Sequence, residues 1–376
     1  MYSDFQDQLR SRLAAINDAG LYNERGTLMS GAAVIDTPQG QVLNFKSSVY
    51  IDNQVDAAKT ENIAAKYGDN PAPVLEGKIA RLLGAESCLL FNSLTDTYVA
   101  ISAQLLNRSD AIIYDTPSLY SFTTAVSRAS KYKFHNTDLA DLEKQLKLSQ
   151  AQQNRLIVVD AVNIASGNIA PLNQIFALAD RYRAMVAVDE TNAAGLFVDG
   201  GGASELLDVK GRAELTIGSL TKAFGCQSGA YIAGRREIID YLRQPTGLPN
   251  FAAPMAKTDI AAAISAIDNL PQNTAQRQYL LQITNYLIRK LYGEGFEIPP
   301  TQSAILAVIV GDNQKAELFA RHLHRNNLLV TCLASPLIDN QNARIVLQLS
   351  ANHTQEQIEQ TAKIFGKVAR EIGILQ

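Results

Sequence analysis

The chain has 376 residues, 34 Lys and Arg against 37 Asp and Glu, and a hydrophobic fraction of 47%. This length predicts two domains, or one large domain with an appendage, and the apolar content is ample for a large core. Because the charges nearly balance, the composition argues against a nucleic-acid-binding protein that relies on bulk electrostatics. Three scattered cysteines, Cys88, Cys226 and Cys332, argue against a disulfide framework and against a zinc site.

No apolar run in the sequence is long enough to span a bilayer. The first residues, Met1–Phe5, lack the basic start and apolar stretch of a secretory signal. We therefore expect a cytoplasmic enzyme that acts on small molecules, with no nucleic-acid partner, no membrane partner and no bound metal.

The N-terminal part of the chain contains three predicted segments. The apolar spacing over residues 4–19 predicts an amphipathic helix that ends at Gly20. Residues 32–45 predict a hairpin around a Pro-Gln-Gly turn. Residues 51–66 are polar and predicted helical, and the cluster at 67–71 breaks that helix.

Residues 74–235 alternate between helical patterns and short apolar strands. Asp138 is the expected N-cap of a helix over residues 139–148. Strands are expected at 87–91, 111–114, 132–136, 155–160, 185–190, 214–218 and 229–233. Continuous apolar strands that alternate with helices indicate an α/β fold with a buried, mainly parallel sheet and helices on both faces. The ligand of such a sheet binds at the carboxyl ends of the strands.

The C-terminal part changes character. Residues 258–293 read as mostly helical, and after them we expect a compact α+β unit with an antiparallel sheet. Its predicted elements are a strand at 304–310, a helix at 314–325, strands at 328–332 and 343–349, and a helix at 354–372. The predicted domains are an N-terminal segment (1–45) packing on the small domain, a large domain (46–240), a helical continuation or linker (241–295) and a small C-terminal domain (296–376).

The stretch Thr216–Gly225 begins like a strand, passes through hydroxyl side chains and presents Lys222 at a strand–loop junction. A lysine that forms a Schiff base with pyridoxal phosphate belongs at such a junction. Taken alone the signal is weak, because most lysines in such a string are solvated or paired with an acid.

Three further features strengthen this interpretation. Ser93–Thr95 lies between a strand and a helix N-terminus, which favours a phosphate, although for this turn taken alone a plain N-cap is the favoured explanation. Asp189 ends a strand and can pair with a protonated pyridine nitrogen, with Asp160 as a rival carboxylate. Ser219, three residues before Lys222, can offer its hydroxyl to the phosphate. Together they predict a pyridoxal phosphate site.

This constellation resembles the α-oxoamine synthases, which are fold-type I pyridoxal phosphate enzymes of the class II aminotransferase group. The most specific strings are Thr216–Gly225 and Gly167–Leu172, and the similarity covers nearly the whole chain. The resemblance implies a large domain with a mainly parallel sheet, a small C-terminal α+β domain and a homodimer with active sites at the subunit interface. It also implies condensation of an amino acid or amine with an acyl thioester, such as an acyl-CoA.

By position, the resemblance makes Lys222 the Schiff-base lysine and Asp189 the partner of the pyridine nitrogen. Ser219 occupies the position of the phosphate hydroxyl, and the backbone amides of Leu94 and Thr95 occupy those that hold the phosphate.

Several substrate-facing positions depart from the family pattern. Leu119 stands where the family has a histidine that stacks on the cofactor ring, so the cover is either apolar or supplied by Tyr120. Asn192 replaces another histidine and can still hydrogen-bond the ring oxygen O3′, but it cannot act as an acid or base. The other replacements are Val49 for an asparagine, Ile164 for a serine and Val346 for the arginine that clamps the substrate carboxylate. Arg344, two residues before Val346, is the remaining candidate clamp.

Two functional hypotheses follow. The first is an active acyltransferase of this family with an altered substrate. The second is a divergent paralogue that binds pyridoxal phosphate but has lost the condensation, runs another reaction on an amine without a carboxylate, or serves as a regulatory or structural subunit. A binding module unrelated to the cofactor requires Lys222 to be a coincidence.

Overall fold

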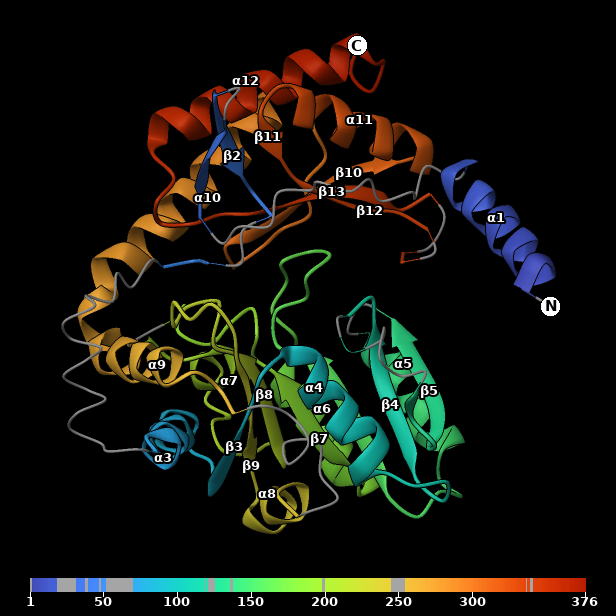
Figure 1. Ribbon diagram of the computed structural model, residues 1–376, viewed down its shortest axis with the longest axis vertical. Helices are drawn as coiled ribbons and strands as arrows, with labels where there is room; N and C mark the ends of the chain where they lie inside the picture. The colour runs from blue at the N-terminus through green and yellow to red at the C-terminus, as the bar shows by residue number, and fades with distance from the viewer. Residues whose placement is uncertain are drawn as a thin grey trace.

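The computed structural model places most of the chain in two lobes that face each other (Figure 1). The residues that it describes are 2–18, 32–37, 40–46, 49–51, 70–118, 120, 126–135, 138–197, 200–244, 254–335, 337–338 and 341–376. The predicted polar helix over residues 51–66 and the candidate ring cover Leu119 lie outside these ranges, apart from Ile51.

The large lobe is built on one seven-stranded sheet with the order β3-β9-β8-β7-β6-β4-β5. Its strands are β3 (Ser87–Phe91), β4 (Ala111–Thr116), β5 (Ser130–His135), β6 (Arg155–Asp160), β7 (Met185–Asp189), β8 (Leu215–Ser219) and β9 (Ala230–Gly234). Strands β8, β7, β6, β4 and β5 pair in parallel. At one side of the sheet, β9 pairs antiparallel with both β8 and β3. The predicted mainly parallel sheet is therefore confirmed.

Both faces of this sheet are covered by helices, because its central strands β6, β7 and β8 are buried on both sides. Ile113, Ile157 and Val188 point into a core cluster with the helices α5 (Leu139–Leu148) and α6 (Leu172–Tyr182). Their sequence neighbours point to the other face, where they meet α4 (Leu94–Val99), the π-helix η1 (Ala100–Leu105) and α8 (Arg236–Leu242). This alternation is the period of two that a pleated strand imposes. The remaining helices of the lobe are α3 (Ala72–Leu83) and α7 (Ala203–Leu206).

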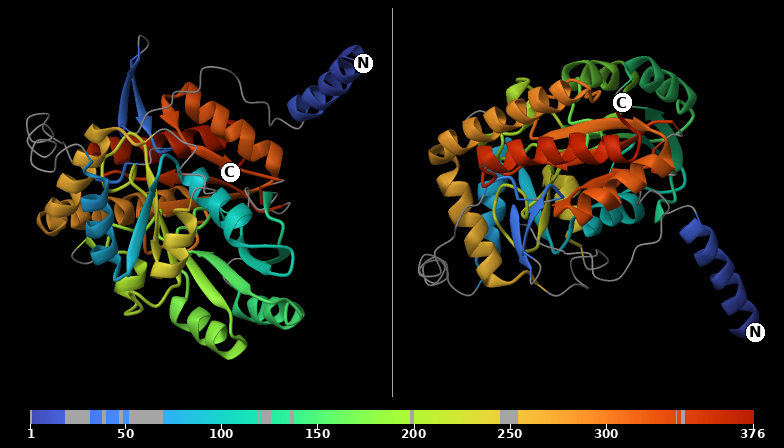
Figure 2. Two further views of the ribbon diagram at one scale, coloured as in Figure 1. Left: turned by 60° about the horizontal axis from the view of Figure 1, so that its bottom comes forward. Right: turned by 90° about the horizontal axis from the view of Figure 1, so that it is seen from above.

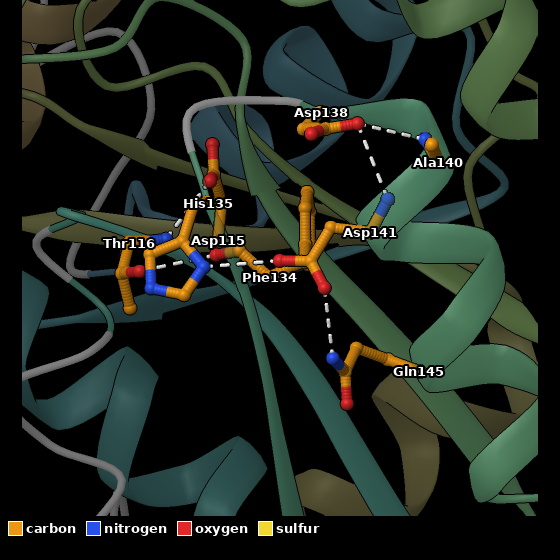
Figure 3. Close-up of polar contacts among 8 residues, drawn as sticks. All are labelled: Asp115, Thr116, Phe134, His135, Asp138, Ala140, Asp141 and Gln145. Carbon is orange, nitrogen blue, oxygen red and sulfur yellow. Dashed lines mark hydrogen bonds and ion pairs between the residues drawn. The ribbon is translucent and has the colours of Figure 1, made fainter.

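The predicted cap of α5 is confirmed. The carboxylate of Asp138 accepts the backbone N–H groups of Ala140 and Asp141, at 2.8 Å and 3.2 Å (Figure 3). Beside it, His135 Nδ1 lies 3.0 Å from Asp141 Oδ2, and that charge-assisted contact lowers the pKa of Asp141. These residues lie at the outer edge of the sheet, because β5 is the last strand in its order.

The second lobe contains an antiparallel sheet with the order β10-β13-β12. Its strands are β10 (Ile305–Gly311), β12 (Thr331–Leu333) and β13 (Ala343–Gln348), and its helices are α11 (Asn313–Arg325) and α12 (Gln355–Glu371). Three segments lead into it from the large lobe: α9 (Lys257–Asn269), the 3-10 helix η5 (Leu270–Asn273) and α10 (Thr274–Glu294). The predicted antiparallel α+β unit is confirmed.

One strand prediction in this lobe is wrong in detail. The sequence predicts a single strand over residues 328–332, whereas the structure divides it at Val330. The first piece, β11 (Leu328–Leu329), pairs parallel with β2 (Gly40–Asn44) of the N-terminal hairpin, and the second piece pairs with β13. The division follows from these two different partners, which no local pattern can specify.

The N-terminal hairpin consists of β1 (Val34–Thr37) and β2, paired antiparallel as predicted. The helix α1 (Tyr2–Asp18) extends away from both lobes in two different views (Figures 1 and 2). Its apolar stripe is exposed, with Tyr2 72% and Phe5 51% accessible. Among the described helices, none combines the length and apolar character needed to cross a bilayer.

Candidate active site

The site lies at the carboxyl ends of three neighbouring parallel strands. Asp160 ends β6, Asp189 ends β7 and Ser219 ends β8, and Asp160 and Asp189 are direct register partners. Because parallel strands end at the same edge, the acids and the lysine loop that follows β8 are brought together there. The tertiary arrangement therefore unites Asp189, Ser219 and Lys222 as the sequence predicts.

Lys222 is buried, with 8% of its surface accessible. Its Nζ donates to Gln348 Oε1 at 3.1 Å and lies 5.3 Å from the centre of the Tyr50 ring. Burial lowers the pKa of this lysine to about 8, while the negative charge of Asp189 opposes the shift. A substantial fraction of the amine is thus neutral near pH 8, and a neutral amine is the form that attacks a carbonyl.

Asp189 is held by two donors. Its Oδ1 accepts the backbone N–H of Thr191 at 2.8 Å, and its Oδ2 accepts the hydroxyl of Tyr98. Burial raises the pKa of Asp189, and these two hydrogen bonds, together with the charge of Lys222, act in the opposite direction. Each carboxylate oxygen has two lone pairs, so Asp189 retains the capacity to accept a further N–H, such as that of a pyridinium ring.

The predicted phosphate-binding groups flank this centre. Ser219 Oγ lies 2.8 Å from Thr221 Oγ1 and accepts the backbone N–H of Thr221 at 3.2 Å. Ser93 is the N-cap of α4, because its Oγ accepts the N–H of Asp96 at 3.2 Å. Leu94 and Thr95 form the first turn of this helix, where backbone N–H groups point away from the helix.

Two other predicted cofactor-binding residues are buried beside the site. Asn192 Oδ1 accepts the hydroxyl of Tyr50 at 3.4 Å, and its Nδ2 donates to the carbonyl of Val162 at 3.3 Å. Tyr120 is fully buried, with its hydroxyl 2.5 Å from Ser102 Oγ. Its ring stands edge-on to that of Tyr98, with 5.4 Å between ring centres.

Strand β13 lines the opposite side of the site with Gln348, Val346 and Arg344. Alternate residues of a strand share one face, and Gln348 identifies the face that contacts Lys222. The Arg344 guanidinium donates from Nη1 to the carbonyl of Ala165, in the loop after β6, at 3.2 Å. Its Nε donates to the carbonyl of Asn342 at 3.0 Å, and burial lowers the pKa of the group. Val346, between them, is fully buried.

Sequence reasoning missed three residues of this centre: Tyr50, Tyr98 and Gln348. For Gln348 a signal existed, since it continues the period-two row of Arg344 and Val346. Tyr50 and Tyr98 belong to other segments of the chain and reach the site only through the fold. Within the described ranges, no group of three His, Cys, Asp or Glu side chains is placed to bind a metal.

The arrangement fits pyridoxal phosphate on the chemistry of its donors. A buried, readily neutralised amine lies close to a buried carboxylate. A serine hydroxyl lies at the carboxyl end of β8, and the N-terminus of α4 follows β3, with β9 between these two strands. This sheet and lysine–aspartate centre define a fold-type I transferase. The model of the aminotransferase class I and II family matches residues 35–365, so the chain belongs to that family.

Within this family, the chain belongs to the α-oxoamine synthases. It is 31% identical to the 2-amino-3-ketobutyrate coenzyme A ligase of Salmonella typhimurium over the full length of both proteins. It is 30% identical to the 8-amino-7-oxononanoate synthase of Thermosipho melanesiensis, over 96% of this chain and 97% of that protein.

Solved structures of serine palmitoyltransferase share the fold. The enzyme from S. paucimobilis with a bound PLP–myriocin aldimine aligns with a TM-score of 0.86 at 21% identity, over 100% of both chains. The Sphingomonas wittichii serine palmitoyltransferase aligns with a TM-score of 0.84 at 22% identity, also over 100% of both chains. These comparisons confirm the predicted family, fold type and enzyme class, and they confirm the cofactor at the level of the family.

Proposed function

We propose that this chain binds pyridoxal phosphate through Lys222 and Asp189 and condenses an amine or amino acid with an acyl thioester. The observation that carries the proposal is the buried Lys222, whose pKa of about 8 is set by burial at the carboxyl end of β8, beside Asp189. Bound pyridoxal phosphate supplies an electron sink that stabilises a carbanion next to the amine nitrogen.

The roles of the protein groups follow from their chemistry. Lys222 holds the cofactor covalently through its amine, and Asp189 keeps the ring nitrogen protonated by accepting its N–H. Ser219 and the first-turn amides of Leu94 and Thr95 bind the phosphate. Asn192, whose side chain accepts a hydrogen bond from Tyr50, would hydrogen-bond the ring oxygen O3′. We propose Tyr120, with Leu119, as the cover of the ring.

The substrate is proposed to differ from the α-amino acids that the family ordinarily uses. The position expected for the carboxylate clamp carries the buried, apolar Val346, which cannot pair with an anion. Arg344 lies two residues away on the same face and is already bonded to the carbonyl oxygens of Ala165 and Asn342. We therefore propose an amine, or an amino acid whose carboxylate extends to Arg344, with an acyl-CoA as the acyl donor and a homodimer as the assembly.

The cofactor half of this proposal is tested by trapping. The purified protein is mixed with pyridoxal phosphate and sodium borohydride, and the modified peptide is mapped. The lysine amine and the aldehyde lose water to form C=N, which hydride reduces to a stable secondary amine. We expect the label on Lys222 and its loss in Lys222→Ala; a label spread over surface lysines contradicts the proposal.

The catalytic half is tested by the release of free CoA. A panel of amines and amino acids is combined with short and long acyl-CoA thioesters, and free thiol is followed with a chromogenic reagent. Thiol release that depends on both substrates and on Lys222 supports the condensation. Specific cofactor trapping without thiol release from any pair supports instead a paralogue that has lost the reaction.

A further inference from the structure

Tyr98 is an unexpected member of the site. It lies on α4, is 3% exposed, and its hydroxyl donates to Asp189 Oδ2. This contact joins two segments that are 91 residues apart in sequence. The aspartate that is proposed to hold the ring nitrogen therefore has a phenol as its second donor, alongside the backbone N–H of Thr191.

The phenol is held rigidly. Its ring meets the Tyr120 ring edge-on, at an interplanar angle of 86°, and Tyr120 is in turn anchored to Ser102 on η1. Both tyrosines belong to the core cluster on this face of the sheet. A side chain already fixed by packing loses little further conformational entropy when it orients a carboxylate, so this geometry suits a positioning role.

The surrounding charges determine where the phenol proton resides. Asp160, at the end of β6, interacts with Tyr98, and Lys222, in the loop after β8, interacts with Asp189. Glu190 and Tyr231 are two further titratable groups close enough to interact with Asp189. Burial, and after it the negative charges of Asp189 and Asp160, raise the pKa of Tyr98 well above its ordinary value. The phenol therefore keeps its proton throughout the usable pH range and remains a donor. A donor directed at a carboxylate favours the ionised form of that carboxylate.

We propose that Tyr98 is a positioning residue that keeps Asp189 ionised and oriented toward the ring nitrogen of bound pyridoxal phosphate. The inference rests on the proposed function, since it concerns the same site. It assigns to this chain a cofactor-tuning group that does not itself touch the reacting atoms. Its loss changes how the cofactor is held and protonated, and that effect can be measured without any turnover.

The test compares Tyr98→Phe with Tyr231→Phe. Tyr231 is a fully buried phenol whose hydroxyl has no hydrogen-bond partner within the described chain, so Tyr231→Phe controls for loss of a buried hydroxyl. For each protein, cofactor affinity is measured by equilibrium dialysis, and the absorbance of the lysine-bound cofactor is titrated between pH 5 and pH 10. Unfolding of the cofactor-free proteins is measured in parallel.

Tyr98→Phe removes a hydrogen bond to the charged Asp189, so we expect it to weaken cofactor binding about tenfold or more. When its nitrogen is protonated less of the time, the ring withdraws electron density less strongly. The midpoint of the absorbance titration should therefore move to higher pH. In an Asp189→Asn background, the same change should have almost no further effect. Tyr231→Phe should match the wild type in both measurements.

Unchanged affinity and midpoint in Tyr98→Phe overturn the inference while leaving the proposed function intact. Tighter binding also overturns it, because the phenol then competes with the ring for Asp189. A wild-type protein that binds no cofactor overturns both proposals. If Tyr98→Phe fails to fold, Tyr98→3-fluorotyrosine provides the second variant: its stronger O–H donor is expected to move the midpoint to lower pH, and no movement overturns the inference.

Discussion

The amine of Lys222 lies 3.1 Å from the side-chain oxygen of Gln348. Lys222 follows β8 in the large lobe and Gln348 ends β13 in the other lobe, so this hydrogen bond links the two lobes at the lysine. Tyr50 reinforces the junction, because its backbone N–H donates to the carbonyl of Lys222 at 3.2 Å. The candidate site is therefore complete only when both lobes are in place.

This contact predicts opposite effects for two substitutions. Gln348→Glu places a negative charge beside the amine and should raise the pKa of Lys222 by about one unit or more, whereas Gln348→Leu removes an acceptor for the charged form and should lower it. The measurement is the pH dependence of the rate of borohydride trapping with pyridoxal phosphate. Gln314→Glu, at the exposed start of α11, adds the same charge far from the site and should leave the profile unchanged. If the pKa of Lys222 shifts in the same direction in both Gln348 variants, the prediction is contradicted.

The apolar Val346 predicts substrate preference. A carboxylate placed against a buried valine loses its hydration without gaining a partner. We expect ethylamine, which lacks a carboxylate, to change the absorbance of the bound cofactor at a concentration no higher than alanine, the matching α-amino acid, requires. The measurement is an absorbance titration at fixed pH. Alanine binding tenfold or more tightly than ethylamine is inconsistent with this prediction.

His353 predicts a loss of stability in mild acid. Its ring is buried against Phe45, its Nδ1 accepts the N–H of Ser350 at 3.0 Å, and its Nε2 lies 3.2 Å from the carbonyl oxygen of Ala33. Burial lowers the pKa of His353 to about 4. Because the folded-state pKa lies below the ordinary value of about 6.5, the unfolded chain takes up the proton first as the pH falls. This group should therefore remove up to about 3 kcal/mol of stability between about pH 7 and pH 4.

Urea unfolding at a series of pH values measures that effect. His353→Gln should be less stable at pH 7.5 but should show a shallower decline toward pH 5. His324→Gln, which removes an exposed histidine near the end of α11, should keep the wild-type decline. Identical slopes in the wild type and in His353→Gln exclude His353 as the source.

Gly218 lies in β8, just before the loop that carries Lys222, and its packing predicts that substitution by alanine is strongly destabilising. A Cβ at this position would lie 2.1 Å from the Tyr231 hydroxyl, so Gly218→Ala forces the buried ring or the strand to move. We expect a loss of about 1–3 kcal/mol in the free energy of unfolding. In Gly77→Ala, on α3, the new Cβ has no neighbour within 4 Å, and the same chemical change should stabilise the helix by about 0.5–1 kcal/mol. Equal effects at the two glycines contradict this explanation.

The amino-acid sequence by itself determined the local structure and the chemical identity of the centre. Runs of buried residues specify β6, β7 and β8, Asp138 caps α5 as predicted, and the lysine stretch Thr216–Gly225 indicates a cofactor. These features depend on residues close together in the chain, where hydrophobic period and side-chain caps act directly.

Only the tertiary structure decided which distant groups surround Lys222 and Asp189. Gln348 arrives from the other lobe, Tyr50 from the segment after the N-terminal hairpin and Tyr98 from α4, and the predicted strand 328–332 divides between two partners. Such contacts depend on the packing of whole lobes and on strand pairing between remote segments. Local periodicity places Gln348 on the same strand face as Arg344 and Val346 but does not specify which residues that face meets, so the contacts are seen only in the folded chain.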